Sequence, residues 1–366
     1  MIVIGTDTHK NTHTVSAVFA GTGQLAGGLT APARKAGFSE LLDWGRELDA
    51  ERIWAIEDCR HVSGSFERFL VALGERVVRV PPKLMGVSRK GERTRGKSDP
   101  IDALAIARAA LAQGPETLPA AHLDKDALEV KLLLDHREDL VKARSEDQQR
   151  LRWHLHDLWP ELQIPAGALD RHIWLDRIAR RLARAEQSAR VRICRELLRV
   201  IRERTRRAAE LEREITALVK AQAPELLELA GCGSLTAAKL LAETAGVGRF
   251  ASDAKLARIA GVAPIPASSG KRDRHRLDRG GNRQLNCALH RIAVTQGRVH
   301  PPARDYLARK QAEGKSRMEA PRCLKRHLAR TVWHALRNAE SRTSNGRPPQ
   351  MNQSPNLRPV TGLALT

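Results

Sequence analysis

Residues 96–108 read Gly-Lys-Ser-Asp-Pro-Ile-Asp-Ala-Leu-Ala-Ile-Ala-Arg, a sequence that is typical of a helix start. Asp99 can cap the helix, Pro100 suits the first helical position, and the alanine and leucine residues that follow favour propagation. Asp99 and Asp102 are three residues apart, so both carboxylates can point in one direction. Two carboxylates held together repel unless a cation lies between them, and hard divalent cations take oxygen ligands. Taken alone, the pattern more often marks an ordinary cap in which Asp102 favours the helix dipole.

The segments before this helix predict a small mixed sheet. We expect strands at 2–7, 14–20 and 24–31, a helix at 35–48, a strand at 52–57, a helix at 63–73 and a strand at 76–80. With the helix at Asp99 the order is β-β-β-α-β-α-β-α, which resembles that of the ribonuclease-H-like fold. Asp7 ends the first strand and Glu57 ends the fourth. Ligands of open α/β sheets gather at strand carboxyl ends.

Acidic residues from two strands and one helix are therefore expected to meet. They are Asp7, Glu57, Asp99 and Asp102. A two-metal site for phosphoryl transfer requires such a set, because the metals bind the scissile phosphate, activate the nucleophile and stabilise the leaving oxygen. Asp58 should point to the opposite face of its strand and is left out. We expect His9 and His13 to be solvated loop residues.

The charge of the chain is unevenly distributed. The chain holds 63 Lys and Arg against 42 Asp and Glu, a net charge of +21. Residues 1–113 hold 16 basic and 13 acidic side chains, net +3, which leaves 47 and 29, net +18, for the remainder. A basic remainder predicts a polyanionic partner held by the later domains, since solubility needs less charge than this.

The cysteines and the hydropathy exclude several protein classes. Five cysteines lie far apart without a Cys-x-x-Cys pair, which indicates neither a zinc site nor a disulfide framework. No apolar stretch reaches membrane length and no signal peptide precedes the first strand. We therefore expect a cytoplasmic protein without membrane contact.

Residues 113–222 are rich in charged helix formers. A helix at 125–158 and a longer helical segment at 176–219 carry apolar residues at helical spacing, with an interruption at 160–174. Two long amphipathic helices predict a coiled coil, either an antiparallel hairpin or a dimer arm, and the sequence does not decide between them. Four arginines of the second segment can contact phosphates or form a solvated face: Arg202, Arg204, Arg206 and Arg207.

Residues 223–340 predict a mostly helical C-terminal domain, and the polar, proline-rich residues 341–366 predict a disordered tail. Gly231 and Gly233 form a Gly-x-Gly before a helix. This resembles the hairpin of helix-hairpin-helix modules, in which glycines let backbone N–H groups approach a DNA phosphate. A plain helix–helix turn gives the same pattern.

The loop at 265–281 joins a serine–glycine pair to a dense cationic run. Ser269 directly precedes Gly270, and Ser268 is the neighbouring alternative. A serine in this setting can attack a phosphate whose charge is neutralised nearby. The same residues also fit a flexible basic loop that binds the nucleic-acid backbone. The basic candidates for this contact are Lys271, Arg272, Arg274, Arg276, Arg279 and Arg283.

These motifs in this order resemble the DEDD transposases of bacterial insertion sequences, in the family numbered one hundred and ten. The resemblance covers residues 2–112 and 225–340. The acids of its RuvC-like domain correspond to Asp7, Glu57 and the Asp-x-x-Asp pair at Asp99. Its C-terminal motifs correspond to residues 230–237, 261–264, 269–270 and 280–283, with Ala230, Cys232 and Gly280 as departures.

The resemblance implies a recombinase in which Ser269 attacks a DNA phosphate and forms a covalent intermediate. It implies that the four carboxylates hold Mg²⁺, or Mn²⁺, around the same phosphate. It further implies a homo-oligomer, a dimer or a tetramer. A noncoding RNA encoded by the element would pair with donor and target DNA, and protein surfaces that bind by charge and shape are compatible with such guidance.

Two other interpretations stay open. A two-metal nuclease akin to a junction resolvase would use water as the nucleophile, but it would not need the C-terminal module with its Ser-Gly loop. A protein that binds nucleic acid without catalysis would not retain four acids, because an unused acidic cluster repels DNA. Tyr306 is the only tyrosine and lies in an ordinary amphipathic helix, which argues against a tyrosine recombinase.

Overall fold

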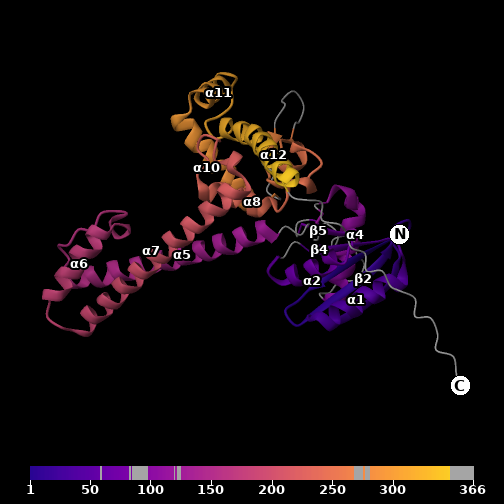
Figure 1. The fold of residues 1–366 in the computed structure, drawn as a ribbon, viewed down its shortest axis with the longest axis horizontal. Helices are drawn as coiled ribbons and strands as arrows, with labels where there is room; N and C mark the ends of the chain where they lie inside the picture. The colour runs from indigo at the N-terminus through magenta and orange to yellow at the C-terminus, as the bar shows by residue number, and fades with distance from the viewer. Residues whose placement is uncertain are drawn as a thin grey trace.

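The computed structural model describes residues 1–57, 60–81, 84, 98–118, 120–121, 125–267, 275–276 and 281–346. The chain forms an N-terminal part built on a sheet, a long helical arm and a helical C-terminal part (Figure 1). The arm projects away from the other two parts, and its free end lies at α6 (His172–Arg184) (Figure 1). The plan expected from the sequence, an α/β part followed by helical regions, is confirmed.

The N-terminal sheet has five strands in the order β3-β2-β1-β4-β5. The strands are β1 (Ile2–Thr8), β2 (Thr12–Phe19), β3 (Leu25–Pro32), β4 (Arg52–Glu57) and β5 (Val77–Val80). β2 runs antiparallel to β1 and β3, whereas β4 runs parallel to β1 and β5. The expected strands are thus confirmed, each to within two residues at its ends.

Helices cover both faces of the sheet (Figure 1). α1 (Lys35–Leu48) and α2 (Arg60–Ala72) cover one face, where Trp54 packs in a fully buried aromatic and aliphatic cluster. α4 (Asp99–Gln113) covers the other face and packs its alanines on Val3 and its neighbours. α2 begins at Arg60 rather than at residue 63, where the sequence predicts its start.

Gly5 lets α4 approach the sheet at very short range. A Cβ at this position would overlap the carbonyl oxygen of Ala103 and the amide nitrogen of Ala107, both backbone atoms of α4. Side chains alternate between the two faces along a strand, so Val3, Gly5 and Asp7 share the face that α4 covers. The missing side chain at Gly5 therefore brings the start of α4 to the strand end that carries Asp7.

The expectation that His13 is a solvated loop residue is wrong. His13 lies on β2 with 1% of its surface exposed, and its ring stacks on Phe38 at 5.4 Å between centroids. Burial lowers the pKa of His13. The surrounding phenylalanines supply the packing that makes an aromatic ring favourable here, so His13 belongs to the core between sheet and helices.

The arm is a helical hairpin formed within one chain. Its long helices are α5 (Lys125–Leu158) and α7 (Ala189–Gln222). Arg137 near the base of α5 pairs with Glu212, whereas Arg144, farther out, contacts Thr205, so the helices run antiparallel. The two long helices thus pair as an antiparallel hairpin within the chain, and an arm that also pairs between chains stays a prediction.

The second helical segment of the arm is not continuous. We expected one segment over 176–219, but α6 ends at Arg184 and α7 starts at Ala189. Ser188 caps α7 by accepting a hydrogen bond from the amide of Val191, as serine commonly does at a helix start. α6 folds back on the hairpin and buries Leu175, Ile178 and Leu182 there.

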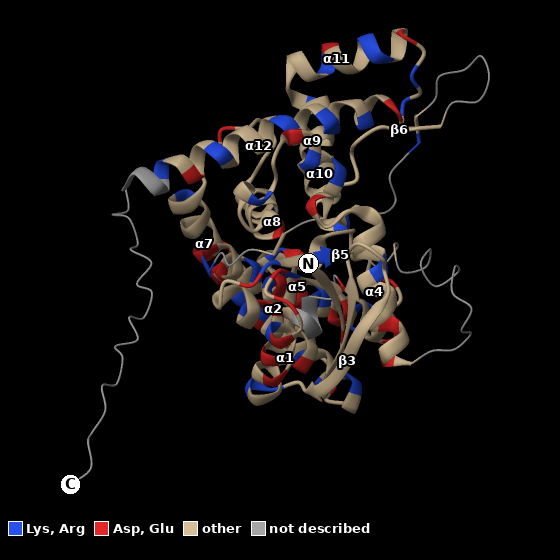
Figure 2. Ribbon diagram, turned by 90° about the vertical axis from the view of Figure 1, so that its right-hand side faces the viewer, with Lys and Arg blue, Asp and Glu red and all other residues tan. Residues whose placement is uncertain are grey.

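The C-terminal part is helical and shares one core with the base of the arm. Its main elements are α8 (Ser234–Thr244), α9 (Asp253–Ile259), β6 (Ile265–Pro266), β7 (His275–Arg276), α10 (Arg283–Val299), α11 (Pro301–Ala312) and α12 (Ala320–Gly346). Short 3₁₀ turns of this part lie at Pro224–Leu226 and Val247–Arg249. Two others lie earlier in the chain, at Pro115–Thr117 and Ala168–Asp170. Val130 and Ile215 from the arm pack in the same buried cluster as Ile292 of α10. Lys and Arg are spread along α10, α11 and α12 (Figure 2).

α12 extends beyond the point where the sequence predicts a disordered tail. The helix continues past residue 341 to Gly346, and Arg342 pairs with Glu225 at 3.1 Å. The expectation of a tail from residue 341 is therefore wrong for the first residues of that segment. The rest of the expected tail, 347–366, lies outside the described residues.

Among the described residues, none of the helices is both long and apolar enough to cross a membrane. Cys194, Cys232, Cys287 and Cys323 are free cysteines within the described part of the chain.

Candidate active site

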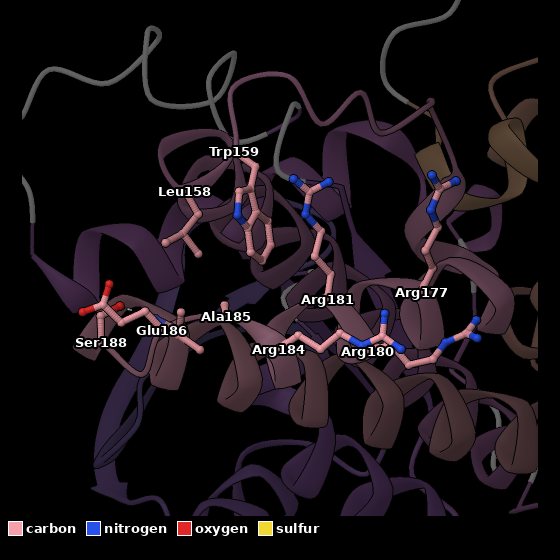
Figure 3. Close-up of a pocket in the computed structure, with 10 residues that line it drawn as sticks. Leu158, Trp159, Arg177, Arg180, Arg181, Arg184, Ala185, Glu186 and Ser188 are labelled. Carbon is pink, nitrogen blue, oxygen red and sulfur yellow. Dashed lines mark hydrogen bonds between the residues drawn. The ribbon is translucent and has the colours of Figure 1, made fainter.

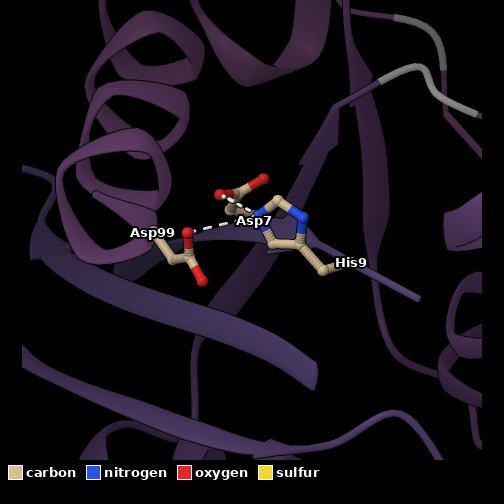
Figure 4. A group of neighbouring side chains, drawn as sticks. All are labelled: Asp7, His9 and Asp99. Atoms are coloured by element: carbon tan, nitrogen blue, oxygen red, sulfur yellow. Dashed lines mark hydrogen bonds and ion pairs between the residues drawn. The ribbon is translucent and has the colours of Figure 1, made fainter. Parts of the chain in front are cut away.

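The carboxyl end of β1 brings acidic and imidazole groups together. His9 Nε2 lies 3.1 Å from Asp7 Oδ2 and 3.3 Å from Asp99 Oδ1, so the ring stands between the two carboxylates (Figure 4). Atoms of these three side chains that can bind a metal all lie within 4.8 Å of one another. Asp7 is buried, whereas His9 and Asp99 are about half exposed. Sequence reasoning missed His9 as a member of this group.

Asp99 is free to face Asp7 because another residue occupies the cap position of α4. The helix is preceded by Ser98 in extended backbone, and Asp99 is already its first helical residue. The prediction that Asp99 caps the helix is therefore wrong by one position. The Ser16 hydroxyl of β2 donates to the carbonyl oxygen of Pro100 at 3.3 Å, which fixes the first turn of α4 against the sheet.

Asp102 lies one turn further along α4 and is buried. Burial raises the pKa of Asp7, His9 opposes this, and the carboxylates of Asp102 and Asp99 raise it further. The two α4 carboxylates are thus close enough to Asp7 to disfavour its charge. The three aspartates predicted from the sequence therefore share one electrostatic environment.

Glu57 ends β4 beside the same strand end. Thr6 pairs with Ile56 in the parallel β1–β4 ladder, so Asp7 and Glu57 are the next residues on adjacent strands. Ile53 and Ala55 pack toward α4, and the alternation along β4 places Glu57 on that face as well. Neighbouring strands lie about 4.8 Å apart, a spacing that carboxylates can bridge through a cation. All four predicted acids therefore come from one edge of the sheet and one helix start.

This set of donors can hold a divalent cation. Its carboxylate oxygens are ligands that Mg²⁺ and Mn²⁺ accept, whereas an imidazole nitrogen is one that Mg²⁺ seldom takes. The position between Asp7 and Asp99 already holds a polar nitrogen of His9 within hydrogen-bond distance of both. Two adjacent carboxylates need a positively charged or hydrogen-bonding group between them. A divalent cation stabilises them more strongly than the His9 imidazole does.

The predicted nucleophile lies outside the described residues. Ser268, Ser269 and the basic residues Lys271, Arg272, Arg274 and Arg279 all fall in the undescribed segments 268–274 and 277–280. The two short strands on either side are described: β6 pairs with β7 in an antiparallel ribbon. Arg276 on β7 and Arg283 at the start of α10 are both exposed.

The base of this loop is held by a crossing of two glycines. A Cβ on Gly281 would overlap the backbone of Gly261, which has a φ of 65°. Asn282 follows, and its side chain caps α10 and donates to Glu243 at 2.8 Å. The motif at residues 261–264 (Gly-x-x-Pro) and the motif at residues 281–283 (Gly-Asn-Arg) therefore lie in contact. The hydrogen bond from Asn282 to Glu243 connects them to α8.

We expect Gly281→Ala to disturb this crossing and to lower strand transfer at least tenfold, because the added methyl group must displace the Gly261 backbone rather than a side chain. Overpacking of this kind costs about 1–3 kcal/mol. Strand-transfer assays and thermal unfolding measure the effect. The matched control is Gly248→Ala, whose Cβ would meet only the Glu340 carboxylate at 3.5 Å. Equal behaviour of the two variants would contradict the prediction.

Gly231 and Gly233 take different structural roles. Gly231 has a φ of 80°, and a Cβ there would press on Thr295 of α10. Turn geometry and close packing therefore explain Gly231. Gly233 is exposed at the N-terminus of α8, where backbone N–H groups lack helical partners. Contact of these glycines with DNA stays a prediction.

Comparison with known proteins agrees with this organisation. Residues 4–160 match a family model described as a transposase, and residues 223–308 match the model of the IS116/IS110/IS902 transposase family. The chain is 27% identical, over 92% of its length and 95% of the relative's, to an uncharacterized 44.8 kDa protein of insertion element IS116 from Streptomyces clavuligerus. It is 32% identical to an uncharacterized 43.6 kDa protein of insertion element IS110 from Streptomyces coelicolor, over 37% of this chain and 35% of that relative.

The chain is thus a DNA transposase, an enzyme that cuts and rejoins DNA. Both matched segments carry the motifs described above: the first contains the four acids and the second contains the glycine crossing and the Ser269 loop. The protein belongs to the IS110 family of insertion-sequence transposases.

Proposed function

We propose that this transposase is a serine recombinase whose ribonuclease-H-like domain assists the chemistry with carboxylate-bound metal. The observation that carries the proposal is the convergence of Asp7 and Asp99 on one point, with His9 between them. The strand order β3-β2-β1-β4-β5 with α4 against β1 supports the ribonuclease-H-like assignment.

Asp7, Glu57, Asp99 and Asp102 would hold Mg²⁺ or Mn²⁺ in this centre. When bound, the metal supplies Lewis-acid stabilisation of charge on the phosphate oxygens. The protein supplies the geometry: Gly5 sets the distance between β1 and α4, and Ser16 fixes the first helical turn. His9 contacts the carboxylates of both Asp7 and Asp99 and would keep them close to each other.

Ser269 would be the nucleophile. Its hydroxyl oxygen would form a bond to the DNA phosphorus, the bond from phosphorus to one sugar oxygen would break, and that oxygen would leave with a proton. Serine is a weak nucleophile at neutral pH and needs alignment and nearby positive charge. Lys271, Arg272, Arg274 and Arg276 are the neighbours in sequence that can neutralise the phosphate.

A homo-oligomer, a dimer or a tetramer, would bring the Ser269 loop of one subunit to the carboxylates of another. A noncoding RNA would select the DNA sites by base pairing. The excess of basic side chains after residue 113 supports contact with both nucleic acids, because it binds phosphate without regard to sequence.

We expect trapping of a reaction intermediate to identify the serine. A DNA-linked peptide should be recovered from the wild type and from Ser268→Ala, and it should be lost in Ser269→Ala, because only Ser269 directly precedes Gly270, and a glycine there would let the backbone turn and expose the hydroxyl. Mass spectrometry of the trapped peptide is the measurement. An adduct that persists in Ser269→Ala would move the role to Ser268. Active wild type without any adduct would favour water as the nucleophile.

A further inference from the structure

The free end of the arm carries a pocket lined by arginines, which we call the arm-tip pocket. It has a volume of about 740 Å³ and is formed by the end of α5, one side of α6 and the turn into α7 (Figure 3). Its basic lining residues are Arg177, Arg180, Arg181 and Arg184 of α6, and Glu186 is the only acidic residue that lines it.

The four arginines lie on one side of α6 because they follow helical spacing. Residues three, four and seven positions apart share a helix face. At 1.5 Å per residue they extend over about 10 Å of the helix axis. Each strand of a nucleic-acid duplex presents one phosphate per about 3.4 Å of its helix axis, so a row of this length can reach roughly two or three neighbouring phosphates.

Aromatic rings orient two of the guanidinium groups. Arg181 lies over the ring of Trp159 at 4.4 Å from the centroid, and Arg177 lies over Trp174 at 5.0 Å. A guanidinium stacked on a ring can keep its N–H edge available for bidentate contact with a phosphate, as that of Arg177 does, whereas Arg181 already pairs with Glu161. Arg177, Arg180 and Arg184 are exposed, and within the described residues no acidic side chain pairs with them.

Several other arginines of the arm form ion pairs. Arg202 pairs with Asp176, Arg204 with Asp147, and Arg206 with Glu203 and Glu210. Arg207 also pairs with Glu210. A second pocket of about 550 Å³ on another side of α6 is lined by Arg195, Arg199, Arg202 and Arg206, of which Arg202 and Arg206 are the ion-paired ones among the described residues. In the structure Arg202, Arg204, Arg206 and Arg207 are ion-paired, and their contact with phosphates stays a prediction.

We infer that the arm-tip pocket binds the phosphate backbone of a nucleic acid, apart from the carboxylate centre. The inference rests on the proposed recombination function, which supplies the nucleic acid. α5 has 34 residues, which corresponds to about 50 Å of helix from the base of the arm to its tip. The pocket therefore acts as a separate point of attachment, and its loss changes affinity rather than metal binding.

The test uses the full-length protein and three labelled probes of equal length: duplex DNA, duplex RNA and single-stranded RNA. The variant is Arg177→Gln/Arg180→Gln/Arg184→Gln. The matched control is Arg202→Gln/Arg206→Gln/Arg207→Gln, which removes the same charge from the same arm at ion-paired positions. Fluorescence anisotropy gives the Kd at several salt concentrations, and Mn²⁺ titration reports the carboxylate centre.

We expect the arm-tip variant to bind at least one probe ten or more times more weakly. For duplex DNA, the slope of log Kd against log salt concentration should fall by up to about 2.7. The control should change affinity less than threefold, and Mn²⁺ binding should stay unchanged in both. The probe that loses most affinity identifies whether DNA or RNA occupies the pocket.

Two results would overturn the inference while the proposed function stands. One is equal weakening by both variants, which would mean that only total charge matters. The other is wild-type affinity of the arm-tip variant for all three probes, which would point to an acidic protein as the occupant. A wild-type chain that binds none of the probes would refute the proposed function together with this inference.

Discussion

Asp7→Asn should lower strand transfer by at least about a hundredfold and weaken Mn²⁺ binding in parallel. Asparagine has nearly the same shape as aspartate but lacks the charge, and Asp7 is the buried member of the group that includes His9 and Asp99. Loss of an outer-shell partner of a metal ligand already costs about 10–100-fold, so loss of a ligand should reach the upper end of that range. Strand-transfer assays and calorimetric Mn²⁺ titration measure the two effects.

The same loss is expected for Asp99→Ala and Asp102→Ala, which remove the two carboxylates of α4. Asp43→Asn is the matched control, because Asp43 is exposed on α1, on the face of the sheet opposite α4. It should retain both metal affinity and strand transfer. Full recombination by a variant that lacks three of the four acids would remove the metal centre from the mechanism.

Gly5→Ala should detach the start of α4 from the sheet and weaken Mn²⁺ binding at least tenfold, although it removes no ligand. The added Cβ would overlap backbone atoms of Ala103 and Ala107, so the helix itself must move. Overpacking typically costs about 1–3 kcal/mol, and contact with backbone atoms places this site at or above the upper end. A shifted α4 carries Asp99 and Asp102 away from Asp7.

Hydrogen exchange followed by mass spectrometry should show faster exchange in residues 99–113 of Gly5→Ala. Gly21→Ala is the matched control, since a Cβ at Gly21 would meet nothing within 4 Å. Unchanged exchange in 99–113 together with weakened Mn²⁺ binding would contradict the steric explanation. Unchanged Mn²⁺ affinity would show that the site tolerates movement of α4.

The placement of the four acidic residues at strand ends and at a helix start was predictable, because each lies at a boundary that the sequence marks. Asp7 and Glu57 lie at the carboxyl ends of apolar strands. Asp99 and Asp102 lie in the first turn of a helix whose start is indicated in the sequence by Pro100. His9 was missed, although a signal existed. It follows Asp7 by two positions, and the two-residue alternation of a strand places both side chains on one face. Because His9 lies just after the end of β1, the strand alternation was not extended to it.

The chain's strands, most of its helices and its four acids follow from local patterns, because alternation, helical spacing and proline at a helix start act over a few residues. Tertiary structure decided what depends on distant partners. Gly5 admits α4 only because Ala103 and Ala107 approach it, and Gly281 is needed only because Gly261 crosses it. Arg202 and Arg204 depend on distant partners in the same way, whereas Arg206 and Arg207 pair with acids on their own helix. Acidic partners such as Asp147 lie far away in sequence and are brought near only when α5 and α7 fold together.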